Sequence, residues 1–238
     1  MEYVQAQFSL KFEPQIRIRR SANQIEDILE EYYGTPQTMP IPDDFAAEAP
    51  RIVLNSKNGH SQISFSQISV DLAVNFDGEY REDFDLTKEY ILQRVNILKD
   101  LLKKIDITTF YFAGISYNVH LNTGDKTPKE YMADLLNVKN ESTDIYEASQ
   151  RIAMVEDNTF FVNEQIGTFK QYQSKGSSIP NLLDFKNSIL VSEGVNLVLD
   201  VNNRYEYLFN GSSKPLDEYE YLITKVYEII ECNLAKWR

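Results

Sequence analysis

Two histidines are the first residues of this chain that could do chemistry. His60 follows a glycine in a turn pattern, and His120 lies inside an alternating segment. Neither has a second histidine or a cysteine at the spacings typical of zinc sites, such as HxH or HExxH. We therefore interpret both as surface or structural histidines and expect no metal and no other cofactor.

The single cysteine, Cys232, lies near the end of a predicted C-terminal helix, beside Ile229 and Ile230. A reactive thiol needs a helix N-terminus or a cation to lower its pKa, whereas the dipole at a helix C-terminus opposes the thiolate. We interpret Cys232 as a packing residue. One cysteine cannot form an intrachain disulfide, which predicts a reduced, cytoplasmic protein.

An acidic cluster could in principle bind a hard cation through its carboxylates. It comes directly before a predicted helix, where acidic side chains are favoured by the helix dipole, so we interpret it as a helix start. The cluster consists of Asp77, Glu79, Glu82, Asp83 and Asp85.

Glycine-rich phosphate loops and the GxSxG motif do not occur in the sequence, so no enzyme class is indicated.

Arg17, Arg19 and Arg20 form the one concentrated basic stretch. The surrounding "QIRIRR" predicts an extended segment in which Arg17 and Arg19 share a face. One interpretation is a contact surface for an anionic partner. The alternative is a charged edge strand that opposes sheet-to-sheet aggregation.

A second hypothesis for binding residues is a pocket between a sheet and long helices. His120 and Tyr117 come from one predicted strand, and Arg151 comes from a later one. If these polar groups converge in a closed cavity, alanine at each position should abolish ligand binding without unfolding the chain.

The first half of the chain contains elements with clear periodicity. Residues 3–12 alternate as a half-buried strand, and Ser21 with Gln24 predicts a capping box for a helix that stops at Gly34. A connection with four prolines follows. Asn58-Gly59 predicts a hairpin, residues 68–76 a further strand, and residues 91–105 an amphipathic helix.

The second half begins again with a long strand near 110–121, predicted to be bulged at Gly114. Thr127, Pro128 and Glu130 predict a capped short helix. The remaining predictions are strands at 146–156 and 159–173 joined at Asp157-Asn158, strands at 185–202 and 204–209 after the connection "KGSSIPN", and a last helix from Pro215.

The two halves therefore show the same order of elements. Each ends with an alternating strand, an Asp/Asn/Gly turn and an acidic start to a long helix, at residues 71–91 and 196–223. We interpret this as an internal duplication with units 1–106 and 107–238 in a single domain. The predicted fold class is α+β, with an antiparallel sheet packed by two long helices.

This order of elements resembles the pseudo-twofold saddle of the TATA-binding-protein fold, with a helix-grip arrangement as the alternative. Three features also resemble an uncharacterised, sporadically distributed bacterial protein family: Pro50-Arg51 before a strand, a hairpin from Ser56 to Gly59, and Asp200 on a late strand. The first resemblance implies a fold, and the second implies no activity.

Charge and composition disfavour some classes of partner and favour one class of function. A net charge of −12 in 238 residues repels nucleic acid and anionic membrane surfaces, and no apolar run is long enough to span a membrane. Fifteen tyrosines and no enzyme motif favour a non-enzymatic protein-interaction module. The alternatives are a small-ligand-binding protein or an undetected enzyme, and, discounted, a nucleic-acid binder. Open sheet edges also allow a homodimer.

Overall fold

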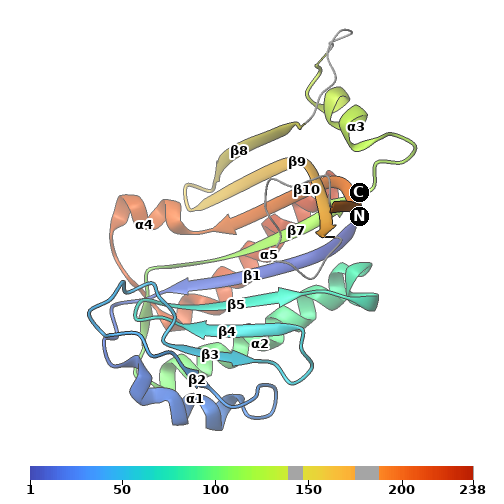
Figure 1. Ribbon diagram of the computed structural model, residues 1–238. Helices are drawn as coiled ribbons and strands as arrows, with labels where there is room; N and C mark the ends of the chain where they lie inside the picture. The colour runs from blue at the N-terminus through green and yellow to red at the C-terminus, as the bar shows by residue number, and fades with distance from the viewer. Residues whose placement is uncertain (139–146, 175–187, 238) are drawn as a thin grey trace.

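The computed structural model describes residues 1–138, 147–174 and 188–237, and its main element is a large antiparallel sheet (Figure 1). The strand order is β2-β3-β4-β5-β1-β7-β10-β9-β8, and β6 pairs with β11 separately. The strands of the large sheet are β1 (Glu2–Lys11), β2 (Gln37–Thr38), β3 (Ile52–Asn55), β4 (Ser61–Phe65), β5 (Ser69–Asn75), β7 (Phe112–Leu121), β8 (Ser149–Glu156), β9 (Phe160–Ser174) and β10 (Ser188–Asn202); the short pair is β6 (Thr109–Phe110) and β11 (Lys214–Pro215).

Strands β1 and β7 join the two halves of the chain at the centre of the sheet. They run antiparallel with Phe8 opposite Ile115, and both residues are buried. Alternate residues of both strands enter the core, as the period-two pattern predicts. The prediction for residues 3–12 is therefore confirmed.

The two long helices, α2 and α5, cover one face of the sheet (Figure 1). The two long helices run antiparallel, because Lys88 of α2 pairs with Glu231 of α5, whereas Lys99 pairs with Glu220 at 2.6 Å. Their apolar faces pack on the sheet. The helices are α1 (Ala22–Leu29), α2 (Phe84–Lys104), α3 (Pro128–Leu135), α4 (Arg204–Asn210) and α5 (Tyr219–Ala235), with short 3₁₀ turns η1 (Ile18–Ser21), η2 (Gly78–Arg81) and η4 (Leu216–Glu218).

The α+β class and the antiparallel sheet with two long helices are thus confirmed. Strand order also follows one rule in each half: the first strand pairs with the last, and the others lie progressively outward, as β1-β5-β4-β3-β2 and β7-β10-β9-β8. A common origin for units 1–106 and 107–238, and a saddle shape, stay predictions.

Several local predictions are confirmed. Gly59 has φ +78° in the β3–β4 turn, and Asp157 and Asn158 have φ of 52° and 49° in the β8–β9 turn. Thr127 caps α3, since its hydroxyl accepts from the Glu130 amide while the Glu130 carboxylate accepts from the Thr127 amide. In each case a short polar motif makes its contacts within a few residues.

Predictions that depended on distant packing were wrong. Residues 204–209 form helix α4 rather than a strand. Its Tyr205 and Phe209 rings lie 4.7 Å apart, one helical turn from each other, while Tyr207 packs against Phe112 at 5.6 Å. The aromatic residues that alternate in this sequence therefore lie on two sides of a helix, where each side makes its own contacts.

Four smaller boundaries also differ from expectation. Gly114 lies in regular pairing, and the strand is interrupted at Tyr111 instead, where the chain passes from β6 to β7. Ser21 makes no capping bond, and α1 ends at Leu29 rather than at Gly34. The last helix begins at Tyr219, because Pro215 pairs with Thr109 in the small sheet. The predicted connection "KGSSIPN" lies outside the described residues.

The proline-rich connection before β3 is organised by one buried cation. Arg51 is fully buried, and its guanidinium donates to the carbonyls of Ala49 at 2.8 Å, Phe45 at 3.1 Å, Pro42 at 3.2 Å and Ala46 at 3.3 Å. A planar guanidinium can bind several carbonyls at once without a counter-ion. Arg51 thereby fixes residues 42–49 beside the short strand β2.

Within the described residues, no helix combines the length and hydropathy needed to cross a membrane.

Candidate binding surfaces

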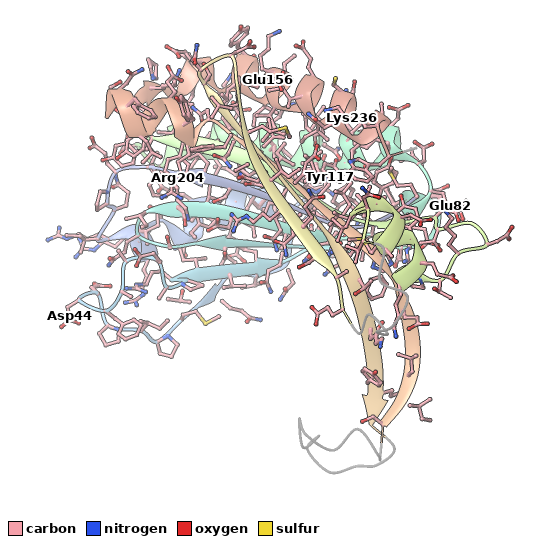
Figure 2. The ribbon with its side chains drawn as sticks, turned by 90° about the horizontal axis from the view of Figure 1, so that it is seen from above. Asp44, Glu82, Tyr117, Glu156, Arg204 and Lys236 are labelled. Carbon is pink, nitrogen blue, oxygen red and sulfur yellow. The ribbon has the colours of Figure 1, made fainter. Side chains whose placement is uncertain are left out.

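The residues predicted to form a pocket lie on different faces of the sheet. Tyr117 points to the helix face and is fully buried (Figure 2). Its hydroxyl contacts the Tyr227 hydroxyl at 3.4 Å and the Thr87 hydroxyl at 3.5 Å. Burial raises the pKa of Tyr117 well above its usual value. Tyr117 therefore belongs to the core between β7 and the long helices.

His120 lies on the opposite face of β7, which we call the open face. Its ring stacks on Phe169 with 4.3 Å between centroids. Partial burial, and then the nearby Arg81, lower the pKa of His120. The ring therefore favours its neutral form and lines a wide cavity of about 900 Å³ at the end of the sheet.

Arg151 is exposed on β8, opposite Gln165 of β9. Strands β10 and β9 separate it from β7, which carries His120. Arg151 does face the same side of the sheet as Asp200, where burial raises the pKa of Asp200 and the Arg151 charge offsets only part of that rise. The structure therefore does not bring His120, Tyr117 and Arg151 into one cavity.

The three arginines of the basic stretch do not lie on a strand. Arg19 and Arg20 are in the 3₁₀ turn η1, and Arg17 directly precedes it. The Arg19 guanidinium pairs with Asp43 at 2.9 Å. The prediction of a shared strand face was therefore wrong, because a turn after Pro14 replaces the second extended run. Arg17 and Arg20 are exposed.

The other residues considered for chemistry also have clear positions. Asp83 caps α2, with its carboxylate accepting from the Asp85 amide at 2.8 Å, which agrees with a helix start. His60 lies 3.5 Å from Asp77. Cys232 is exposed, so the packing interpretation was wrong. Among the described residues no group of three or more His, Cys, Asp or Glu side chains is placed to hold a metal.

The open face contains a half-buried carboxylate that residue spacing alone did not mark as a site. Asp200 of β10 accepts from the side-chain amides of Asn163 at 2.9 Å and Asn202 at 2.8 Å, both at its Oδ2 atom. Burial is the main cause that raises the pKa of Asp200. A cavity of about 210 Å³ lies beside it, lined by Gln7, Ser9, Phe112, Gly114, Ser116, Asp200, Asn202 and Arg204.

A different kind of surface lies at the β8 edge of the sheet. Strand β8 pairs with β9 along eight residues, and no other described strand pairs with it. The Thr168 amide donates to the Ala148 carbonyl at 3.0 Å, which sets the phase of the ladder. Because ladder bonds alternate in an antiparallel pair, Arg151, Ala153 and Val155 direct their backbone N–H and C=O groups away from β9.

Two large apolar side chains are exposed along this edge. Ile152 is 42% exposed and Val155 is 45% exposed. Helix α4 adds to the surface at the same end, since Tyr205 packs on Phe161 of β9 at 5.2 Å and Phe209 is 72% exposed. We define the edge surface as Ile152, Ala153, Val155, Leu208 and Phe209.

No family model and no curated protein matches this chain. The geometry of these surfaces is therefore the basis for a functional interpretation.

Proposed function

We propose that this chain is a non-enzymatic interaction module that binds a protein partner along the edge surface. The observation that carries the proposal is the eight-residue strand β8, whose outward backbone groups have no strand partner among the described residues and lie beside exposed apolar side chains. An extended segment of a partner can add to such an edge through backbone hydrogen bonds, while side-chain pockets select its sequence. Native proteins usually shorten, charge or cover edges of this kind.

Charge and composition support the same class of function. The net charge of −12 disfavours nucleic acid as the partner, so that role stays discounted. A cytoplasmic location is part of the proposal, because Cys232 cannot form an intrachain disulfide.

The test is native mass spectrometry of the chain purified gently from its own host. Wild type should retain a protein adduct, and Ile152→Lys should lose it, because an ammonium group then lies on the apolar side of the edge. Thr38→Lys, on exposed strand β2 at the other end of the sheet, is the matched control and should keep the adduct. An adduct, whether a host protein or a second copy, that survives Ile152→Lys contradicts the proposal, and so does a wild type that shows only the mass of one bare chain.

A second function, small-ligand binding, is favoured by the Asp200 cavity. Two amide N–H groups converge on one carboxylate oxygen, so the carboxylate is held rigidly on the cavity wall. A cationic or hydroxyl-bearing ligand would complement it. In the same spectra, a small retained mass that is present in wild type and lost in Asp200→Asn identifies this function. Its presence in both proteins contradicts it.

A further inference from the structure

We propose that the edge surface binds a second copy of this chain, with β8 pairing antiparallel to β8 across a twofold axis. This inference rests on the proposed function and names its partner. It predicts one continuous antiparallel sheet across two chains, because β8 is the last strand of the nine-stranded sheet. Symmetric dimers of this kind use one self-complementary surface.

Strand geometry restricts the ways in which two β8 strands can pair. Residues directly opposite each other in an antiparallel ladder point to the same face of the sheet. A residue of β8 must therefore lie on the twofold axis, opposite its own copy. Arg151, Ala153 and Val155 direct their backbone groups outward, so centring on Ala153 lets all three form ladder bonds, about six hydrogen bonds in total.

Side chains favour the register centred on Ala153. On the helix side of the sheet, Ile152 then lies opposite Met154 of the second copy, so the exposed apolar side chain gains an apolar partner. Centring on Met154 instead places Ile152 opposite the carboxylate of Glu156. Centring on Ile152 places Met154 opposite the polar Gln150.

Charge also favours an antiparallel second copy. With Ala153 on the axis, Arg151 lies opposite the uncharged Val155 of the second copy on the open face, and the two Arg151 side chains are four residues apart along the ladder. Parallel pairing in register would instead place Arg151 beside Arg151, which is unfavourable.

Cysteine cross-linking tests both the dimer and its register. Cys232 is exposed, so every variant also carries Cys232→Ser. In Ala153→Cys the two Cα atoms should lie about 5.5 Å apart, within the range of a disulfide, so mild oxidation should give a covalent dimer. Arg151→Cys is the matched control: its two copies are offset by four residues, about 13 Å, and should remain monomeric on a non-reducing gel.

The outcomes separate this inference from the proposed function. Sedimentation should show a wild-type dimer at tens of micromolar and a monomer for Ile152→Lys, with unchanged circular dichroism. A wild type that is monomeric at that concentration overturns the inference. So does a dimer that Ile152→Lys leaves intact, or one that cross-links at Arg151→Cys but not at Ala153→Cys. If the second copy fails but a host protein is still lost in Ile152→Lys, the proposed function stands alone.

Discussion

The two edges of the sheet are built in opposite ways. At one edge, β2 has two residues and is followed by a proline-rich connection that the buried Arg51 guanidinium fixes. At the other edge, β8 has eight residues, no proline and exposed apolar side chains. Figure 2 shows how far apart the two regions lie, with Asp44 in the connection and Glu156 at the end of β8. The comparison indicates that one edge is closed to further strands and the other is open to them.

The largest expected effect is at the closed edge. Arg51→Ala removes a fully buried guanidinium that binds four partly buried carbonyls, so the free energy of unfolding should fall by about 3 kcal/mol. Urea denaturation measures the loss. The control is Arg151→Ala at the open edge, where an exposed arginine should change stability by less than about 0.5 kcal/mol. Equal losses would show that the two edges do not differ in this way.

The next effect compares the sheet centre with the open edge. A Cβ atom at Gly114 would lie 2.3 Å from Asn202 Cβ and 2.8 Å from the Val201 carbonyl oxygen. Gly114→Ala should therefore cost about 1–3 kcal/mol, because β7 and β10 are held on both sides. Gly167→Ala meets Ser149 Cβ at 3.1 Å, but edge strand β8 can shift, so its cost should be smaller. Thermal or chemical denaturation that ranks them in reverse would contradict this.

A smaller effect tests which backbone groups of β8 are unpaired. Ala153→Pro removes an outward N–H and should leave the unfolding free energy of the monomer within about 1 kcal/mol of wild type. Met154→Pro removes an N–H that bonds β9 and should cost about 1–2 kcal/mol more. Denaturation at concentrations below dimer formation distinguishes them. Similar unfolding free energies for the two variants would contradict the assignment of Met154, rather than Ala153, as the residue whose N–H bonds to β9.

The smallest effect concerns pH and the Asp200 carboxyl on the open face. Because its pKa is raised in the folded chain, the folded state binds more protons than the unfolded state between the ordinary and the raised pKa. Stability attributable to Asp200 therefore falls as pH rises through that window. Asp200→Asn should melt slightly higher than wild type at pH 7, and the difference should vanish below about pH 4, the ordinary carboxyl pKa. A difference that stays constant from pH 3 to pH 8 would contradict this origin.

Sequence reasoning was most accurate where a few neighbouring residues determine the conformation. The Thr127–Glu130 capping box and the turns at Gly59 and Asp157 depend on local hydrogen bonds and local φ angles, and all were confirmed. The alternation in β1 was equally informative, because one face of that strand is buried along its length. These features need no knowledge of distant partners.

The misplaced elements depend on residues far away in the sequence. Helix α4 forms where Tyr205 and Tyr207 find partners in β9 and β7, and alternation alone could not distinguish that from a strand. The pocket hypothesis for Tyr117 and His120 failed because residues three apart on a strand face opposite sides of the sheet. The edge surface was also not predicted, since strand order decides which strand is last.

The central position of β1 has a consequence for synthesis. Its partner β5 belongs to the first half of the chain, but its other partner, β7, begins at Phe112, about a hundred residues after β1. Until the ribosome releases β7, a folded first half presents ten residues of β1 as a temporary open edge. Cotranslational folding of this chain should therefore be most prone to wrong association in that interval, and the arrival of β7 should end it.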